Sequence, residues 1–135
     1  MRRFAESDTE SVVALWTQVF NYDELHSDPY ISIERKTSRD PDLFMVAVAD
    51  GRIIGTVMGG YDGHRGWVYS LAVDEARRHS GIGSALVERI EQSLKAIGCL
   101  KVNLQVVGSN SSVVDFYKRL GFSVEDRISM GKRLY

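Results

Sequence analysis

An apolar stripe at helical spacing lies near the start of the chain. Ser7 and Glu10 stand in the arrangement of a capping box, and the apolar residues behind them recur on one face of a helix. The stripe consists of Val12, Val13, Leu15, Trp16, Val19 and Phe20. This pattern predicts a helix over about 8–20. A second short helix is expected over about 30–39, because the Asp40-Pro41 pair disfavours its continuation.

The next part of the chain has the pattern of antiparallel strands. Residues 43–49 form an apolar, β-rich run, and the Asp50-Gly51 pair after it is a strong signal for a two-residue hairpin. We therefore expect 52–60 to be the antiparallel partner strand. Turn-forming residues within 61–66 predict a second hairpin, which leads into a strand over 67–73.

Helical spacing returns after residue 81, and strand-like alternation follows it. The apolar residues of this third helix, three or four positions apart, are Ile82, Leu86, Ile90, Leu94 and Ile97. Gly98 is expected to end the helix. Apolar and polar residues then alternate from 100 to 106, which predicts a half-buried strand.

A last helix and two short strands complete the expected order of elements. Asn110 or Ser109 can cap this helix, and Gly121 is expected to close it. Its core face carries Val113, Phe116 and Leu120. Two short strands are expected over about 122–126 and 128–134. The order is then β-α-α-β-β-β-α-β-α-β-β, within a single domain over 1–135.

Composition and charge narrow the class of protein. A chain of 135 residues with 44% hydrophobic content makes one domain with a real core. Its net charge of −1 argues against a nucleic-acid partner, and no apolar run is long enough to span a membrane. Cys99 is the one cysteine, and the N-terminus lacks a signal-peptide pattern, so we expect a cytoplasmic protein. His64 and His79 have no second ligand at metal spacing, so no metal site is expected.

The candidate chemistry centres on a glycine-rich turn at the start of the third helix. Two glycines, Gly81 and Gly83, stand where an apolar strand gives way to this helix. Backbone without Cβ can approach a ligand closely, and the first amides of a helix are unpaired donors, so the turn suits a pyrophosphate. A dinucleotide fingerprint would need a small residue where Leu86 stands, and the Gly-Lys-Ser/Thr of a nucleotide-hydrolase loop does not occur.

Two motifs in order resemble a known superfamily. Arg-x-x-Gly-x-Gly at 78–83 and Asn-x6-Tyr-x3-Gly-Phe at 110–122 resemble the GNAT N-acetyltransferases, and the stretches 59–66 and 130–134 are similar to small bacterial members of the YpeA type. The resemblance implies an α+β GNAT fold. Its mixed, mostly antiparallel sheet of about seven strands would have helices on both faces and be splayed between strands four and five.

The resemblance also implies the donor and its binding residues. Acetyl-CoA would lie in the gap between the splayed strands. Backbone groups of Leu71, Ala72 and Val73 would pair with the pantetheine arm, and an amide there would polarise the thioester carbonyl. The pyrophosphate would be bound by the turn residues Arg78, His79, Ser80, Gly81, Ile82, Gly83 and Ser84. Asn110 would contact the pantetheine or order the helix start, and Tyr117 would be the general acid that protonates the leaving thiolate.

The acceptor side departs from one branch of the superfamily. Gln105 stands where the ribosomal-protein alanine acetyltransferases carry a glutamate base, and an amide cannot take a proton. Glu24, His26 and Glu34 are candidate bases, as is a water held by Gln105 or Asn103. Tyr69, like Tyr61 and Trp67, either packs on the sheet or shapes the acceptor pocket.

Two functions of different classes follow from these residues. The first is an N-acetyltransferase that moves an acetyl group from acetyl-CoA to a primary amine by direct attack in a ternary complex. Its acceptor is a small molecule or a protein N-terminus or lysine. The second is a non-catalytic acyl-CoA sensor that keeps the cofactor turn without turnover. Relatives frequently form paired subunits, so a homodimer is compatible with either function.

Overall fold

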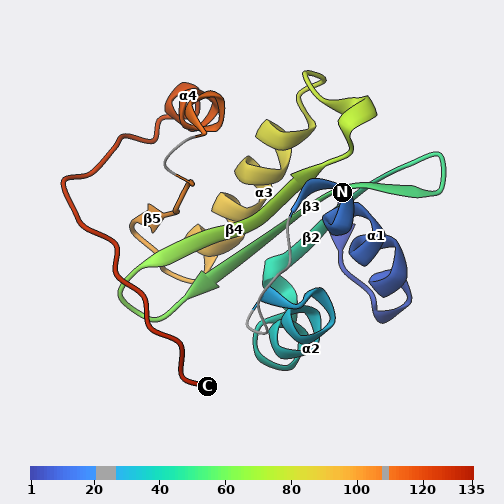
Figure 1. Ribbon diagram of the computed structural model, residues 1–135, viewed down its shortest axis with the longest axis horizontal. Helices are drawn as coiled ribbons and strands as arrows, with labels where there is room; N and C mark the ends of the chain where they lie inside the picture. The colour runs from blue at the N-terminus through green and yellow to red at the C-terminus, as the bar shows by residue number, and fades with distance from the viewer. Residues whose placement is uncertain (21–26, 108–109) are drawn as a thin grey trace. The chain divides into compact units, whose positions relative to one another are not determined.

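The computed structural model describes residues 1–20, 27–107 and 110–135. Within it the chain divides into two compact units, Met1–Gln105 and Val106–Tyr135. The first unit contains a sheet with helices, and the second contains one helix and the C-terminal residues (Figure 1).

The first unit is built on a five-stranded mixed sheet in the order β1-β2-β3-β4-β5. Its strands are β1 (Arg2–Arg3), β2 (Phe44–Ala49), β3 (Arg52–Tyr61), β4 (Gly66–Val73) and β5 (Val102–Asn103). Neighbouring strands are antiparallel except β4 and β5, which are parallel. The two predicted hairpins are confirmed. Asp50 and Gly51 both have positive φ, as the tight turn between β2 and β3 requires.

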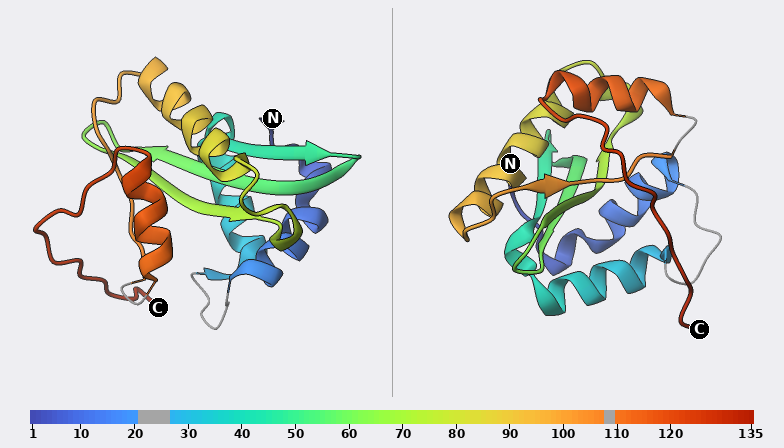
Figure 2. Two further views of the ribbon diagram at one scale, coloured as in Figure 1. Left: turned by 90° about the horizontal axis from the view of Figure 1, so that it is seen from above. Right: turned by 90° about the vertical axis from the view of Figure 1, so that its left-hand side faces the viewer.

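Helices cover both faces of this sheet, as expected (Figure 2). The helices α1 (Thr9–Val19) and α2 (Pro29–Arg39) lie on one face, and α3 (Ile82–Ala96) lies on the other. Short 3₁₀ turns precede α1 (Glu6–Asp8), link α2 to β2 (Pro41–Leu43) and follow β4 (Glu75–Arg77). Alternation along β2 explains the two layers, because Met45 and Ala47 face α3 while Phe44 and Val46 face α1 and α2.

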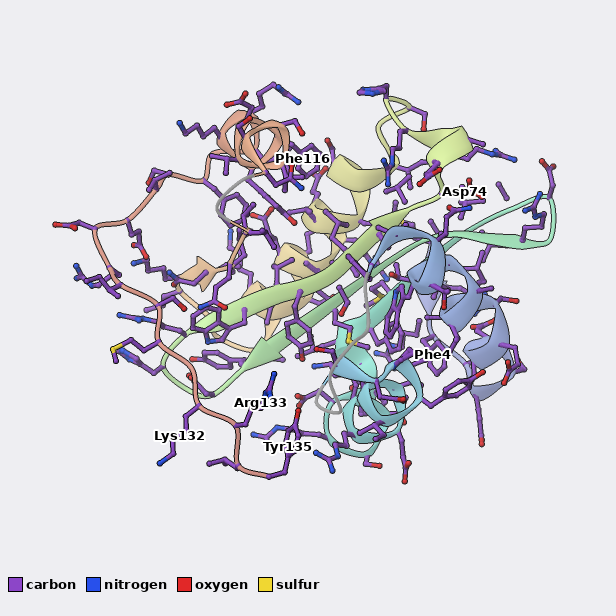
Figure 3. All side chains as sticks on the ribbon, in the orientation of Figure 1. Phe4, Asp74, Phe116, Lys132, Arg133 and Tyr135 are labelled. Carbon is purple, nitrogen blue, oxygen red and sulfur yellow. The ribbon has the colours of Figure 1, made fainter. Side chains whose placement is uncertain are left out.

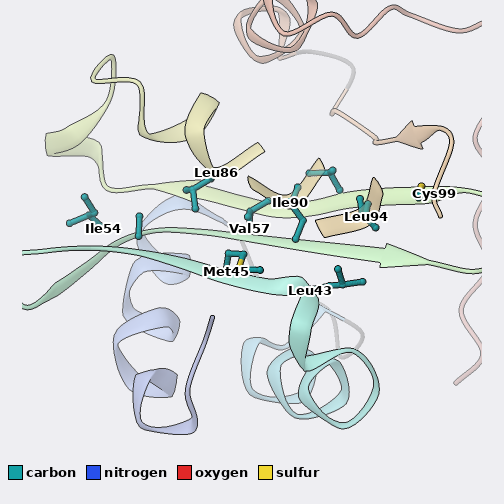
Figure 4. Packing of buried hydrophobic residues seen from close by; sticks show 10 residues of the cluster. Leu43, Met45, Ile54, Val57, Leu86, Ile90, Leu94 and Cys99 are labelled. Atoms are coloured by element: carbon teal, nitrogen blue, oxygen red, sulfur yellow. The ribbon is translucent and has the colours of Figure 1, made fainter. Parts of the chain in front are cut away.

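The face toward α3 is closely packed (Figure 4). Leu86, Ile90 and Leu94 of the predicted apolar stripe are fully buried against the sheet, and Ile82 is partly buried. Burial of each fully buried side chain is worth ~1.5–3 kcal/mol. The prediction of Ile97 as the last member is wrong, because Ile97 follows the end of α3 and is 54% exposed. Gly59 on β3 makes the approach possible, because a Cβ there would lie only 2.7 Å from Ile90 Cγ1. The position of α3 therefore depends on the absence of a side chain on β3.

The other face is closed by aromatic residues of α1 and β2. Trp16 and Phe44 stack with ring centroids 5.9 Å apart, and Phe4 stacks on Phe44 at 4.4 Å. Two polar residues, Thr56 and Lys36, are also buried on this side. Buried polar groups need hydrogen-bond partners, and both of these residues have them.

The second unit contains α4 (Ser111–Arg119), which ends before Gly121 as predicted. No strand follows it among residues 120–135, so the expected strands over 122–126 and 128–134 are wrong. The expected strand after α3 is also shorter than the alternation suggested, since only Val102–Asn103 pairs with a neighbour. The described part of the chain thus has five strands, not about seven. Apolar alternation was present, but it cannot form a strand without a partner.

The splay expected between strands four and five stays a prediction, and the register shows only how far the two strands pair. Within the described residues, β4 and β5 pair only through Gly66 with Val102 and Trp67 with Asn103. The remainder of β4, from Val68 to Val73, pairs with β3 and extends past the paired part of β5.

Among the helices described, none is long and apolar enough to cross a membrane.

Candidate functional site

The candidate site begins at a bulge in β4. Thr56 pairs with Ala72 and Met58 pairs with Tyr69, so two residues of β4, Ser70 and Leu71, stand opposite one residue of β3. Ser70 has φ of 53°, in the left-handed region that non-glycine residues rarely adopt. The bulge lies in the part of β4 that β5 does not pair with. Backbone groups of the predicted donor-binding residues Leu71, Ala72 and Val73 therefore follow directly on a local break in the ladder.

A buried hydrogen-bond chain holds this bulge from behind. The indole nitrogen Nε1 of Trp16 donates to Thr56 Oγ1 at 2.8 Å. The Thr56 hydroxyl donates in turn to the Ser70 carbonyl oxygen at 3.0 Å. Thr56 has no exposed surface, and Trp16 is 1% exposed. Helix α1 is thus linked through β3 to the strained residue of β4.

The turn between β4 and α3 is arranged around two left-handed residues. Asp74, at the end of β4, accepts a hydrogen bond from Ala76 N at 2.9 Å and so starts the 3₁₀ turn (Figure 3). His79 and Gly81 then have φ of 63° and 85°. Gly81 is the N-cap residue of α3, and its positive φ explains why glycine stands there. Arg78, His79 and Ser80 are exposed on this turn.

The N-terminus of α3 differs from that of α2 in its capping. Asp28 caps α2 by accepting from Tyr30 N and Ile31 N, whereas α3 has no side-chain cap; its first turn also has no acidic residue. Its first helical bond runs from Ala85 N to Gly81 O. The amides of Ile82, Gly83 and Ser84 are therefore donors that the helix itself does not use. This arrangement suits an anion.

The second unit holds the predicted Asn110 and Tyr117. Asn110 caps α4, since its Oδ1 accepts from Val113 N at 3.4 Å. Tyr117 is buried, and its ring makes edge contacts with Phe116 and Phe122 at centroid distances of 5.0 and 5.5 Å. Burial raises the pKa of Tyr117 to about 12. Its phenol is consequently fully protonated at neutral pH.

The predicted acceptor residues within the described part of the chain come from different segments of the first unit. Glu34 is exposed on α2, Asn103 is half-buried in β5, and Gln105 is exposed at the end of the first unit. Tyr69 is 41% exposed on β4. Glu24 and His26 lie outside the described residues. Ser109, the alternative helix cap, also lies outside them.

A buried lysine contacts Tyr69 and was missed by the sequence analysis. Lys36 Nζ donates to the Gly59 carbonyl, lies 3.3 Å from Asp40 Oδ2, and sits 5.2 Å from the centroid of the Tyr69 ring. One signal could have found it: Lys36 stands three positions after buried Ile33, on the apolar face of α2. Thr56 had a similar signal, as one hydroxyl in the apolar run 53–58.

Comparison with known proteins identifies the family. The sequence model of the acetyltransferase (GNAT) family matches residues 9–122. The chain belongs to this family. It is therefore an acetyltransferase, and the donor used by the family is acetyl-CoA. The described residues contain no group of three or more histidine, cysteine, aspartate or glutamate side chains that could hold a metal ion.

Full-length relatives carry the same assignment. An acetyltransferase of Pectobacterium atrosepticum is 46% identical over 136 residues, covering 99% of this chain and 94% of that protein. An acetyltransferase of Yersinia enterocolitica is 45% identical, with the same coverage of both chains. The similarity extends over both units of the chain.

Solved structures share the fold. Ard1 of Thermoplasma volcanium has a TM-score of 0.81 at 28% identity, covering 92% of this chain and 82% of that one. The acetyltransferase AAC(6')-Iy, solved with a bisubstrate analogue of CoA, has a TM-score of 0.80 at 17% identity, covering 98% and 95%. The expected GNAT fold class is confirmed by these neighbours, apart from the number of strands.

Proposed function

We propose that this acetyltransferase transfers the acetyl group of acetyl-CoA to a primary amine by direct attack in a ternary complex. The observation that carries the proposal is the first unit's combination of an uncapped α3 N-terminus with a bulged, partly unpaired β4. The first feature suits a diphosphate, and the second suits an extended thioester arm. The two features are consecutive along a chain that belongs to the GNAT family.

Binding of the donor uses mainly backbone groups. The amides of Ile82, Gly83 and Ser84 donate hydrogen bonds to the pyrophosphate oxygens. Exposed Arg78 supplies a positive charge beside the pyrophosphate. The pantetheine arm pairs with β4 beyond Trp67, where β5 no longer pairs with it. An amide of the 71–73 segment then donates to the thioester carbonyl and stabilises the negative charge that develops on its oxygen.

Proton movement can be worked out from the pKa of Tyr117. The neutral amine attacks the carbonyl carbon to form a tetrahedral intermediate. The attacking nitrogen loses its extra proton to solvent, and the carbon–sulfur bond breaks to release CoA thiolate. The leaving thiolate has a conjugate acid that resembles Cys, with a pKa near 8.5. Full proton transfer to it from a phenol of pKa about 12 therefore costs ~5 kcal/mol. Tyr117 therefore stabilises the leaving sulfur by donating a hydrogen bond, and the thiolate takes its proton from solvent.

The acceptor amine must lose a proton before it attacks, and the cost of that loss depends on the pKa of the amine. Deprotonation at pH 7 costs ~4.6 kcal/mol for a lysine side chain of pKa about 10.4, but only ~1.4 kcal/mol for an α-amine near 8. Gln105 cannot accept that proton, and Glu34 is the candidate base within the described residues. The proposal therefore favours amines of low pKa, on a small molecule or a protein N-terminus.

Release of CoA thiol tests the proposal. Purified protein is given acetyl-CoA and a panel of small amines, peptides with free N-termini and lysine peptides, and free thiol is followed over time. We expect at least one class to raise the rate above hydrolysis. Binding of acetyl-CoA without thiol release from any acceptor would instead favour the sensor function.

The role of Tyr117 is tested in the same assay. Tyr117→Phe should lower kcat at least about tenfold without weakening acetyl-CoA binding, because it removes only the donor to the leaving sulfur. Tyr30→Phe is the matched control, since Tyr30 is an exposed tyrosine whose hydroxyl bonds to Glu10 on α1. Equal rates for the wild type and Tyr117→Phe would remove Tyr117 from the mechanism.

A further inference from the structure

The hydrogen-bond chain behind the β4 bulge has only one possible direction. An indole N–H can donate but not accept, so the hydroxyl oxygen of Thr56 must accept from Trp16. The single hydroxyl proton of Thr56 is then committed to the Ser70 carbonyl. The chain thus runs from Trp16 through Thr56 to Ser70 without an alternative arrangement.

This chain orients one peptide group. The described residues contain no cis peptide bond, so the peptide between Ser70 and Leu71 is trans, with its C=O and N–H pointing in opposite directions. Thr56 lies on β3, and the Ser70 carbonyl therefore points toward β3. The Leu71 N–H consequently points away from the Thr56 hydroxyl, and it belongs to the part of β4 beyond the residues that pair with β5.

The backbone at Ser70 needs such a restraint. Its φ of 53° is unfavourable for a residue with a Cβ, and a strained conformation persists only where its surroundings enforce it. Thr56 supplies the enforcement from a position with no solvent access, next to the buried side chains of Val57 and Met58. A valine would fill the same volume there without any directional bond.

From this geometry we infer that Thr56, supported by Trp16, is a positioning residue for acetyl transfer. It holds the Ser70–Leu71 peptide so that the Leu71 amide donates to the thioester carbonyl of acetyl-CoA. The inference rests on the proposed function, and it names both the amide that forms the oxyanion site and the residues that aim it. Thr56 itself touches neither substrate.

The test is the infrared stretch of the thioester carbonyl in bound acetyl-CoA labelled with ¹³C at that carbon. A donated hydrogen bond lowers this frequency relative to acetyl-CoA in buffer. We expect wild type to show the lowering and Thr56→Val to lose at least half of it. The kcat of Thr56→Val should fall about 10–100-fold, less than or comparable to the loss of one oxyanion donor. Its affinity for CoA, which has no acetyl group, should stay within about twofold of wild type.

Two further variants separate positioning from stability. Thr56→Ser keeps the hydroxyl and should restore both the frequency and kcat, although it removes a buried methyl group. Trp16→Phe removes the indole donor, together with part of a buried ring, and frees the hydroxyl to turn, so it should give a partial loss of the lowering. These variants also serve if Thr56→Val fails to fold, which circular dichroism would reveal.

The outcomes distinguish the inference from the function beneath it. A wild type that binds no acetyl-CoA would overturn the proposed function. A wild type with a lowered frequency that Thr56→Val leaves unchanged would overturn the positioning role alone. An equal loss of the frequency lowering and of kcat in Thr56→Ser and Thr56→Val would also overturn it, because packing and not the hydroxyl would then position the amide.

Discussion

The close approach of α3 to β3 gives a prediction whose size can be worked from the structure. A methyl group added at Gly59 would lie 2.7 Å from Ile90 Cγ1 and 3.1 Å from Ile90 Cδ1. Ile90 is fully buried, so neither atom can move aside without shifting the helix. Overpacking of this kind costs ~1–3 kcal/mol, and replacing glycine by alanine in a strand returns ~0.5–1 kcal/mol. Gly59→Ala should therefore destabilise the protein by about 1 kcal/mol, and by at most about 2.5 kcal/mol.

The adjacent glycine provides a matched control. A methyl group at Gly60 would meet its nearest neighbour, Tyr69 Oη, at 3.4 Å, which is an ordinary contact. Urea titrations should show a lower midpoint for Gly59→Ala, with an unchanged slope, and a midpoint equal to or above wild type for Gly60→Ala. Truncating the neighbour with Ile90→Ala should make the Gly59→Ala change less costly. Equal midpoints for the two alanine variants would refute the packing of α3 described above.

Two pH-dependent predictions follow from the groups whose pKa is shifted in the folded protein. The difference in absorbance near 295 nm between wild type and Tyr117→Phe should titrate near pH 12, because burial raises the pKa of Tyr117; a midpoint at 10 would show that the ring is solvated. The pKa of Asp8 is lowered, first by the hydrogen bond from Arg2 at 2.7 Å and then by Ala5 N. Its contribution to the free energy of unfolding is thus present above the unfolded value of 3.8 and lost as the pH falls below it. Asp8→Asn should flatten the acid limb of stability, and parallel acid limbs for wild type and variant would contradict the pairing.

The local signals in the sequence predicted most of the first unit. Helix α3 follows from the spacing of Leu86, Ile90 and Leu94, and all three are buried as expected. The β2–β3 hairpin follows from Asp50-Gly51, because that pair adopts the positive φ that the turn requires. These features depend on a few neighbouring residues, which is why a single chain sufficed to predict them.

The errors concern features that depend on distant partners. Residues such as Ile128 and Leu134 alternate with polar ones, yet they are 91% and 94% exposed and lie in no strand. Alternation shows which face of a strand would be buried, but not whether another strand is there to pair with it.

The candidate site was predictable in its local parts only. The turn at the start of α3 could be located because Gly81 and Gly83 mark it directly, and its binding of an anion stays a prediction. Thr56, Trp16 and Lys36 could not be assigned in the same way, since the hydrogen bonds Thr56–Ser70, Lys36–Gly59 and Trp16–Thr56 join residues 14 to 40 positions apart in the sequence. Only folding shows that these groups meet.

The binding of acetyl-CoA at the start of α3 is the central claim, and calorimetric titration of two glycine variants tests it most directly. Gly81 and Gly98 flank the two ends of α3, with φ of 85° and 93° and no atom within 4 Å of an added Cβ. Gly81→Val and Gly98→Val should thus carry similar backbone strain. The account predicts that acetyl-CoA binds wild type and folded Gly98→Val but not folded Gly81→Val. Equal affinity in both variants would contradict it.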